Sequence, residues 1–495
     1  MGKSLMIMGT ASSVGKSVIT TGLCRLFYNK GINVYPFKSQ NMALNSYITS
    51  DGKEMGRAQV VQAEAAGKIP SVKMNPILIK PSSDTESQII VMGKILENMN
   101  ASNYHNYKPR LKEIVSECYF ELENESDLVI IEGAGSPAEI NLREGDLVNM
   151  GMAEISNSPV ILVGDIDKGG VFASLYGTIK LLSPNEQKRI KGVIINKFRG
   201  DIKLLEPGLK MLEELIDIPV LGVIPWNDID IEDEDSLTNR FNNRQSGGVV
   251  ELTVLKYPHI SNYTDFTYLE SLEDVNVRYV SKGDPIGYTD VIVIPGSKSV
   301  VTDFNFLKSC GWDREIYKHN KEGRLIIGIC GGFQMLGKRI EDPHCVEGDI
   351  KSSNGLGLLD MVTSFETEKR TIQNSGVITE IDGEFSSLSG ISVQGYEIHM
   401  GSTISNENYF LKDQSGFYDG AVKGNVIGTY FHGIFDSSEF TSTLISKIKR
   451  DKGLDIDTNI IDYKTYKDLE FNKLAELYKQ NLDMDKIKRI IEDWA

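Results

Sequence analysis

The sequence predicts an α/β protein with two doubly wound domains, each built on a mostly parallel sheet, and a helical tail at the end of the chain. Three observations predict this fold class. In the first half, short continuous apolar runs alternate with helix-length segments, which is typical of parallel strands covered by helices on both faces. After an acidic, amide-rich stretch the same alternation resumes, and the last part of the chain carries apolar residues at helical spacing.

The first domain is assigned to residues 1–235 and contains six predicted strands. In a doubly wound sheet the ligands bind outside the carboxyl ends of the strands, so the residues that follow each strand are the first candidates for a site. The six predicted strands are SLMIMG (4–9), INVYPFK (32–38), DLVIIEGAG (127–135), PVILVGDID (159–167), GVIINKF (192–198) and PVLGVIP (219–225).

A change in composition separates the two halves of the chain. Residues 227–248 are acidic, then rich in amides, and end in two glycines, so that residues 236–248 are predicted to be a linker. The second domain is assigned to residues 249–440 and a C-terminal helical extension to residues 441–495. The strands predicted for the second domain are 249–258, 275–280, 290–298, 324–330 and 424–431.

Composition and charge argue against several classes of protein. The chain has 495 residues and a net charge of −16, which disfavours a nucleic-acid binder and attraction to an anionic membrane surface. No apolar run reaches the ~20 residues that span a bilayer. The five cysteines form no CxxC pair, which favours a reduced, cytoplasmic setting. We therefore expect no nucleic-acid or membrane partner, and the sequence leaves the oligomeric state open.

The first predicted strand runs into a candidate phosphate-binding loop, GTASSVGKS (9–17). Such a loop presents backbone N–H groups and the positive end of a helix to phosphates. Lys16 is placed to reach the terminal phosphates of ATP, and Ser17 to bind Mg²⁺. Gly9 lies one residue earlier than the usual spacing requires, so that Thr10 stands in the usual glycine position. The alternative is a glycine-rich turn with an ordinary lysine, which the flanking strand and helix disfavour.

Further polar residues follow other strands of the first domain. Glu132, in IIEGAGS, is a carboxylate suited to bind Mg²⁺ beside phosphate oxygens. Asn196, at the end of a late strand, is a candidate for reading adenine. Residues 36–67 are unusually polar for a segment that follows a strand, although a plain loop and helix is the simpler interpretation. The candidates for contacts with ATP, phosphate or substrate are Thr10, Gly15, Lys16, Ser17, Asn196, Lys38, Asp146, Lys168 and Arg199.

The second domain carries a candidate nucleophile, Cys330, in GICGGFQMLG (328–337). The flanking glycines permit the strained turn between strand and helix that exposes a nucleophile. A thiolate needs a base, and His432, in GTYFHGIF, follows a later strand of the same domain. His399, in GYEIHMG, is the second candidate, for which we expect a structural or pocket-lining role. The backbone N–H groups of Gly331 and of Gly296, in IPGSK, are candidates for an oxyanion hole.

Both halves resemble known families. GTASSVGKS with EGAG resembles the motifs of dethiobiotin synthetase and its phosphate-loop relatives, which use ATP to activate a carboxylate. The Cys330 turn, PGSK and the Tyr-x-His-Gly motif resemble the flavodoxin-like class I glutamine amidotransferase domain, and GYEIHMG looks like its cobyric/cobyrinic acid synthase branch. Many class I members follow the histidine with Pro-Glu and use that glutamate as the third catalytic residue, whereas this chain has Gly433-Ile434. Glu397, Asp436 or no third residue therefore remain as alternatives.

From about residue 4 to beyond residue 436, the motifs are similar to those of the cobyric acid synthase family. The resemblance implies amidation, with ATP, Mg²⁺ and glutamine, of carboxylates b, d, e and g of adenosylcobyrinic acid a,c-diamide, a corrinoid polycarboxylate of cobalamin biosynthesis. Such a substrate requires local positive charge. One alternative is a cobyrinic acid a,c-diamide synthase, which has the same pair of domains, and a remote one is a partitioning-type nucleotide-switch ATPase with an inactive second domain. The candidates for binding the substrate carboxylates are Lys38, Arg57, Lys168 and Arg199.

Overall fold

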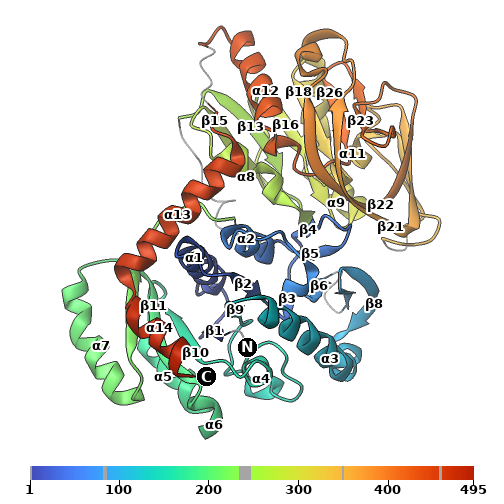
Figure 1. Cartoon of the computed structure of the whole chain (residues 1–495). Helices are drawn as coiled ribbons and strands as arrows, with labels where there is room; N and C mark the ends of the chain where they lie inside the picture. Colours follow the sequence, from blue (N-terminus) through green and yellow to red (C-terminus); the bar gives the residue numbers. More distant parts are fainter. Residues whose placement is uncertain (1–2, 82–85, 233–246, 348–349, 456–459, 495) are drawn as a thin grey trace. The chain divides into compact units, whose positions relative to one another are not determined.

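The structure is a computed structural model that describes residues 3–81, 86–232, 247–347, 350–455 and 460–494 (Figure 1). Contacts divide the chain into two compact units, and neither is continuous in sequence. The first unit contains Met1–Ala43, Glu54–Glu234 and Tyr466–Ala495, and the second contains Leu44–Lys53 and Asp235–Thr465. Two segments differ from the sequence-based assignment: Leu44–Lys53 belongs to the second unit, and Tyr466–Ala495 belongs to the first. The predicted linker, residues 236–248, lies largely outside the described residues.

The first unit is built on a six-stranded parallel sheet with the order β12-β11-β10-β1-β9-β2. All six strands predicted for this half of the chain are present. Ile7 pairs with Glu132, and Asp165 pairs with Asn196, so that the residues after these strands meet along one edge of the sheet. The strands are β1 (Lys3–Gly9), β2 (Val34–Phe37), β9 (Leu128–Glu132), β10 (Val160–Asp165), β11 (Ile190–Phe198) and β12 (Val220–Pro225).

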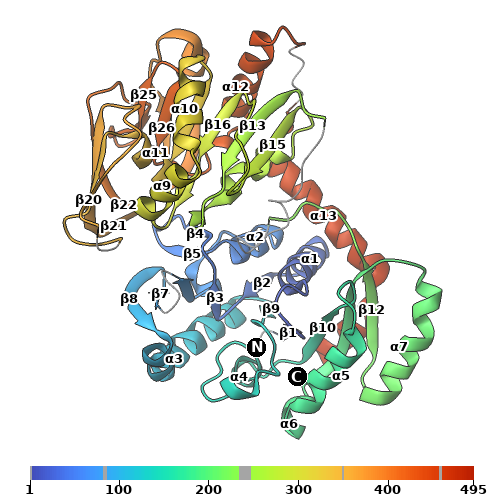
Figure 2. The same ribbon diagram turned by 180° about the vertical axis from the view of Figure 1, so that it is seen from behind.

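Helices flank this sheet, and α1 (Lys16–Asn29) begins directly after the candidate phosphate loop. Gly15, its N-cap, has a φ of +101°, in the left-handed region that favours glycine. Figure 2 shows α1 beside α2 (Arg57–Ala65). Within the part of the chain that the structure describes, every helix is too short or too polar to cross a membrane. The other helices of this unit before the linker are α3 (Ala101–Glu125), α4 (Met150–Ile155), α5 (Val171–Leu181), α6 (Pro184–Gln187) and α7 (Ile202–Ile216).

A smaller sheet, which the sequence analysis did not predict, lies in the first unit. Its order is β3-β6-β7-β8, with β3 and β6 parallel and the other pairs antiparallel. Its first strand has only three residues, two of them polar, so it lacks the continuous apolar run by which buried strands are recognised. The strands are β3 (Gln40–Met42), β6 (Ile77–Pro81), β7 (Glu86–Val91) and β8 (Lys94–Asn100), and β5 (Glu54–Gly56) precedes α2.

The second unit has its own six-stranded sheet, with the order β15-β13-β16-β18-β26-β25. All pairs are parallel except β25 with β26, and the five strands predicted from the sequence are present. The strands are β13 (Val250–Leu255), β15 (Val275–Val280), β16 (Val291–Ile294), β18 (Leu325–Ile329), β25 (Ala421–Lys423) and β26 (Val426–Thr429), and the helices of ten or more residues are α9 (Val300–Ser309), α10 (Trp312–Lys321) and α12 (Ser438–Asp451).

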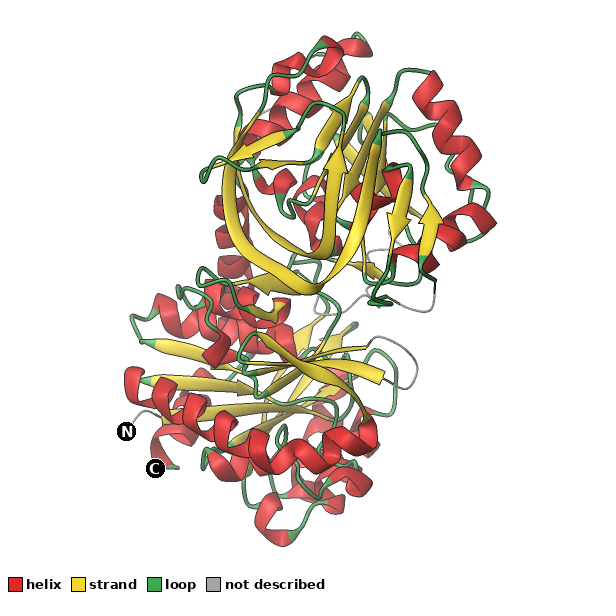
Figure 3. Ribbon diagram, turned by 90° about the vertical axis from the view of Figure 1, so that its right-hand side faces the viewer, coloured by secondary structure: helices red, strands yellow, loops and turns green. Residues whose placement is uncertain are grey.

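A long antiparallel hairpin, β21 (Met361–Ile378) with β22 (Ser392–Ser405), adds a further sheet to the second unit. Figure 3 shows its two strongly curved strands. The sequence analysis did not predict these strands, because their exposed residues interrupt any continuous apolar run. The remaining strands of this sheet are β19 (Arg339–Glu341), β20 (Ser352–Asn354), β23 (Leu411–Asp413) and β24 (Tyr418–Asp419).

The predicted C-terminal extension divides between the two units. Helix α12 is packed in the core of the second unit through Phe440 and Leu444. In contrast, most of α13 (Tyr463–Asn481) and all of α14 (Met484–Asp493) belong to the first unit, where Leu474 and Tyr478 join the same core as Leu23 of α1. Apolar residues at helical spacing identify a helix that packs, but they do not identify the surface it packs on, which is why the sequence left this placement open.

Candidate active sites

The loop between β1 and α1 curls around the side chain of Lys16. The Lys16 ammonium donates to the carbonyl oxygens of Ala11 and Gly135, both at 3.0 Å, and the lysine is only 7% exposed. Position 9 has no room for a side chain, because a Cβ at Gly9 would lie 2.5 Å from a methyl group of Val14. The unusual spacing therefore belongs to a compact loop that holds its lysine at the start of a helix.

Ser17 and Glu132, which the sequence predicted as Mg²⁺ ligands, lie together. The Ser17 hydroxyl donates to Oε1 of Glu132 at 2.8 Å, and the Lys38 ammonium donates to the same oxygen at 2.9 Å. Gln62, from α2, donates to the other carboxylate oxygen of Glu132, whose side chain is buried. Hydroxyl and carboxylate oxygens at the mouth of a phosphate loop are the hard donors that suit Mg²⁺.

The protein alone does not form a complete metal cage here. In the described ranges no group of three or more His, Cys, Asp or Glu side chains is arranged to hold a metal ion. This fits Mg²⁺, which usually takes one or two protein ligands together with phosphate and water oxygens. The residues present therefore fit a nucleotide-bound Mg²⁺ and do not fit a resident structural metal.

Asn196, the candidate for reading adenine, is placed under the phosphate loop. Its side-chain amide donates to the carbonyl of Val14 at 2.9 Å, and a Cβ at Gly15 would lie 2.2 Å from the same nitrogen. Asn196 therefore supports the loop in this structure, and its contact with adenine stays a prediction. Thr10 is held to the sheet by its backbone N–H, which donates to the carbonyl of Val163.

The other candidate residues of the first unit differ in the contacts that their side chains make. Asp146 accepts backbone N–H groups from Val148 and Asn149 on one carboxylate oxygen and from Gly151 on the other, so its contacts are those of a turn and offer no support for a ligand role. Arg57 forms a buried ion pair with Glu232.

Two further basic candidates lie on exposed loops. Arg199 pairs with Asp167 at 3.1 Å and lies over the ring of Trp226 at 4.1 Å. Lys168 is exposed, in the loop before α5. Lys197, which the sequence analysis did not single out, donates to Ser13 of the phosphate loop and to Asp165.

In the second unit, Cys330 occupies the sharp turn between β18 and α11 (Gly331–Leu336). Its φ is +51° and its ψ −107°, a conformation that side-chain-bearing residues rarely adopt outside functional turns. Two residues after Cys330, Gly332 packs directly against the backbone of β16. A Cβ at Gly332 would lie 1.8 Å from the carbonyl oxygen of Ile294. The thiol lies 3.6 Å from the carbonyl oxygen of Ile398. The sequence pattern around Cys330 is thus explained by a strained turn that close backbone packing keeps in place.

His432 follows β26, and its imidazole lies close enough to the Cys330 thiol for the two groups to interact electrostatically. Its Nδ1 lies 2.8 Å from Oδ2 of Asp265, and Oδ1 of Asp265 accepts the backbone N–H of Gly433 at 2.9 Å. Both side chains are buried. Burial alone lowers the pKa of His432, but the Asp265 carboxylate and the Cys330 thiol outweigh it and raise the pKa to about 10. Cysteine, histidine and aspartate form a connected chain of proton donors and acceptors.

Asp265 is the residue that the sequence analysis missed. It lies in a single-turn helix, Tyr263–Phe266, 167 positions before His432, and no motif distinguishes it from any other loop aspartate. Of the two carboxylates that the sequence offered as the third residue, Glu397 pairs with Arg370 at 2.7 Å instead. Asp436 follows the histidine in a short turn, but the contact with Nδ1 belongs to Asp265.

The predicted oxyanion-hole residues lie beside Cys330 and His432. A Cβ at Gly296 would lie 3.1 Å from Cε1 of His432, and a Cβ at Gly331 would lie 2.8 Å from the backbone nitrogen of Ser297. The turn after β16 and the start of α11 therefore approach each other closely. The role of their backbone N–H groups in binding an oxyanion stays a prediction.

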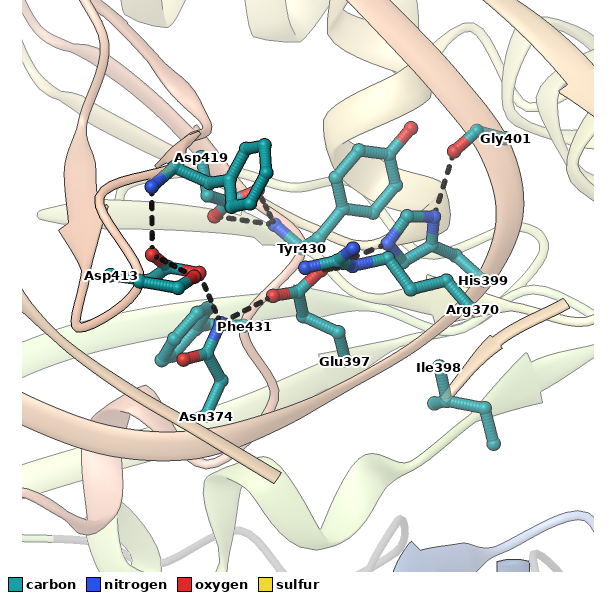
Figure 4. Close-up of polar contacts among 12 residues, drawn as sticks. Arg370, Asn374, Glu397, Ile398, His399, Gly401, Asp413, Asp419, Tyr430 and Phe431 are labelled. Carbon is teal, nitrogen blue, oxygen red and sulfur yellow. Dashed lines mark hydrogen bonds and ion pairs between the residues drawn. The ribbon is translucent and has the colours of Figure 1, made fainter. Parts of the chain in front are cut away.

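His399 belongs to a charged cluster on β21, β22 and the strands beside them (Figure 4). Its Nε2 lies 3.2 Å from Glu397, its Nδ1 lies 2.7 Å from the carbonyl of Gly401, and its ring stacks on Tyr430 at 3.7 Å. A cavity of about 280 Å³ is lined by this histidine and by Arg370 and Glu397, among others. Since successive side chains of a strand alternate in direction, Ile398 faces the other way, as Figure 4 shows. The pocket-lining position expected for His399 matches its place in the structure.

Two family models match the chain, one in each half. Residues 5–238 match the CobQ/CobB/MinD/ParA nucleotide binding domain, and residues 251–440 match the CobB/CobQ-like glutamine amidotransferase domain. The fold and its two sites thus define a glutamine amidotransferase joined to a nucleotide-binding domain, an ATP-dependent ligase that hydrolyses glutamine.

Curated relatives define the family more narrowly. The chain is 51% identical over 506 residues to a cobyric acid synthase of Thermoanaerobacter sp. (strain X514), covering 99% of each chain. It is 52% identical over 505 residues to a cobyric acid synthase of Alkaliphilus metalliredigens (strain QYMF), covering 99% of this chain and all of the relative. The chain belongs to the cobyric acid synthase family. Neither alternative, the a,c-diamide synthase nor the partitioning-type ATPase, is favoured by these matches.

Proposed function

We propose that this enzyme amidates carboxylates b, d, e and g of adenosylcobyrinic acid a,c-diamide with ammonia from glutamine, and that it uses ATP and Mg²⁺ to activate each carboxylate. The observation that carries the proposal is the identity of 51–52% over essentially the whole length of cobyric acid synthases, together with a phosphate loop and a cysteine–histidine pair on one chain. A corrinoid with several peripheral carboxylates is the substrate class that this family implies.

In the first unit, the proposed reaction is transfer of the terminal phosphoryl group of ATP to a substrate carboxylate. Lys16 binds the terminal phosphates, and the amides at the start of α1 bind phosphate oxygens. Ser17 and Glu132 would hold Mg²⁺, which when bound neutralises charge on the phosphates. Lys38, 2.9 Å from Glu132, is the basic residue best placed at this point to attract the substrate carboxylate or the acyl phosphate.

In the second unit, the proposed reaction releases ammonia from glutamine. The Cys330 sulfur attacks the carboxamide carbon while its proton passes to Nε2 of His432, and the N–H groups near Gly331 and Gly296 bind the oxyanion. His432 then returns this proton to the departing nitrogen, and a glutamyl thioester and ammonia result. Water, deprotonated by His432, attacks the thioester and releases glutamate and the thiol.

Asp265 has the positioning role in this scheme. Since it accepts a hydrogen bond from Nδ1, it directs the other nitrogen of His432 toward the thiol and stabilises the imidazolium that forms. The ammonia attacks the carbonyl carbon of the acyl phosphate, phosphate leaves, and the amide forms.

The test is incubation of the full chain with ATP, Mg²⁺, glutamine and the corrinoid, followed by mass spectrometry. We expect stepwise conversion of acids to amides, each step lowering the mass by about one unit because –OH becomes –NH₂. Cys330→Ala should lose amidation with glutamine but retain it with added ammonia, whereas Lys16→Ala should lose both. Full glutamine-dependent activity in Cys330→Ala, or persistent amidation in Lys16→Ala, would show that the corresponding site is assigned wrongly.

A further inference from the structure

Segment Leu44–Lys53 leaves the first unit and packs in the second, close to the cysteine–histidine site. The Tyr396 hydroxyl donates to the carbonyl of Ser46 at 3.3 Å, and Thr371 donates to the carbonyl of Gly52 at 3.0 Å. Ile48 is buried against Tyr396 and Ile398. The segment is therefore anchored near both ends and in its middle on the hairpin of β21 and β22, and the carbonyl of Ile398 in β22 faces the Cys330 thiol.

Asn262 connects this segment to the catalytic histidine. Its side chain is 3% exposed, with Oδ1 3.3 Å from the backbone nitrogen of Ser46 and Nδ2 3.2 Å from Nε2 of His432. A backbone N–H can only donate, so the oxygen of the Asn262 amide must face Ser46. The amide NH₂ must then face Nε2 of His432 and can only donate to it.

This contact sets the state of the proposed base. A donor facing Nε2 requires a lone pair there, and Nε2 has only one, which the Cys330 thiol also needs in order to release its proton. An imidazolium would point a second N–H at the Asn262 amide. Among the described residues, the groups that face His432 are Asp265 and Cys330, which favour its protonated form, Asn262, which opposes it, and the stacked ring of Tyr396.

We infer that Asn262 is a positioning residue that restrains His432 in a resting state, and that the Ser46 N–H of segment Leu44–Lys53 holds the Asn262 amide in the orientation that does so. The inference rests on the proposed role of Cys330 and His432. In this state the amide N–H competes with the thiol for Nε2, and glutamine hydrolysis is slow. When the Ser46 N–H no longer holds Oδ1, the amide can turn away and Nε2 becomes available to the thiol.

Two variants of the whole chain test this restraint, one at Asn262 and one at Ser46. Asn262→Gly removes the amide and keeps the left-handed backbone of this position, whose φ is +52°. Ser46→Pro removes the N–H that holds the amide in place, together with the serine hydroxyl. Ser50→Pro is the matched control, because it puts proline at the second position of the Thr49–Gly52 turn, where proline is favoured.

Two quantities are measured: the hydrolysis of glutamine in the absence of the other substrates, and the rate at which iodoacetamide alkylates Cys330, followed by mass spectrometry of the Cys330 peptide. In Asn262→Gly and Ser46→Pro we expect hydrolysis of glutamine alone and alkylation of Cys330 to rise by about three- to tenfold, the range set by one neutral hydrogen bond. Ser50→Pro should behave as the wild type, and amidation with added ammonia should report that every variant is folded.

The inference is overturned if both test variants, while retaining ammonia-dependent amidation, leave hydrolysis of glutamine alone and alkylation at or below the wild-type level. It is equally overturned if Ser50→Pro releases hydrolysis as strongly as Ser46→Pro does. Failure of the proposed function has a different signature, since Cys330→Ala would then still hydrolyse glutamine whatever the Asn262 variants show.

Discussion

Replacement of Asp265 by asparagine tests the proton pathway of the second unit with almost no change in volume. The aspartate accepts two hydrogen bonds, from Nδ1 of His432 at 2.8 Å and from the Gly433 N–H at 2.9 Å. Asparagine has a single acceptor oxygen. If this oxygen stays with the Gly433 N–H, the new NH₂ group faces Nδ1 and forces the proton of His432 onto Nε2, the nitrogen that must receive the proton of Cys330.

The size of the effect follows from burial and distance. Both side chains are almost completely inaccessible to solvent. Two unit charges 2.8 Å apart attract each other by about 6 kcal/mol at an effective dielectric constant of 20. Loss of about two thirds of this interaction, the rest being replaced by the amide dipole, lowers kcat for glutamine hydrolysis by about 10³-fold.

The assay is a comparison of kcat with glutamine and with added ammonia in the same Asp265→Asn preparation. We expect the ammonia-dependent rate to stay within about twofold of the wild type, because that reaction does not use the cysteine. If kcat for glutamine hydrolysis falls by less than about tenfold, the assignment of Asp265 as the partner of His432 is refuted. That result would favour a cysteine–histidine pair without a third residue.

Three further predictions concern the first unit and the stability of the fold. Glu132→Gln removes the carboxylate that both Ser17 and Lys38 contact. The rate of ammonia-dependent amidation should therefore fall by about 100-fold, while hydrolysis of glutamine alone persists. An unchanged amidation rate over a Mg²⁺ titration would contradict the metal assignment. Gly22→Ala should destabilise the first unit by about 1–3 kcal/mol in urea unfolding, because its Cβ would lie 2.3 Å from the Tyr478 ring; a stabilised variant would contradict this packing. Burial lowers the pKa of His319 from 6.5 to about 4, so the folded chain binds fewer protons than the unfolded chain in this range, and the free energy of unfolding should fall as pH drops from about 6.5 to 4. His319→Gln should reduce that slope in urea titrations at pH 7 and 5, and an unchanged slope would show that other groups carry it.

Local patterns were enough to predict the two central sheets and the strand ends that carry the candidate site residues. The phosphate loop, Glu132 and Cys330 each lie at a strand end, and in a parallel sheet strand ends meet at one edge. His432 could be predicted because a later strand of the same domain delivers it. In each of these cases a short stretch of sequence contains both the residue and the element that positions it.

The parts that sequence reasoning missed depend on contacts between distant residues. Asp265 stands in an ordinary loop, and only the folded chain brings it to His432. Leu44–Lys53 interrupts one unit to pack in another, which no periodicity signals. Asn196 illustrates a different limit: its position at a strand end was predictable, but whether its amide faces a ligand or the loop of Val14 is a matter of side-chain rotamer.

The placement of the last helices has a consequence for how the chain is made. Tyr478 and Leu474 complete a core whose other members include Leu5 and Ile7 of the first strand. A ribosome that has synthesised the chain up to residue 235 has therefore produced a unit that lacks part of its own interior, and the missing part arrives only after the second unit has been synthesised. Until then, apolar surface on α1 stays uncovered while the whole second unit is synthesised. We expect C-terminal truncation to damage the N-terminal half of this enzyme first, and nascent chains to depend on protection during this interval.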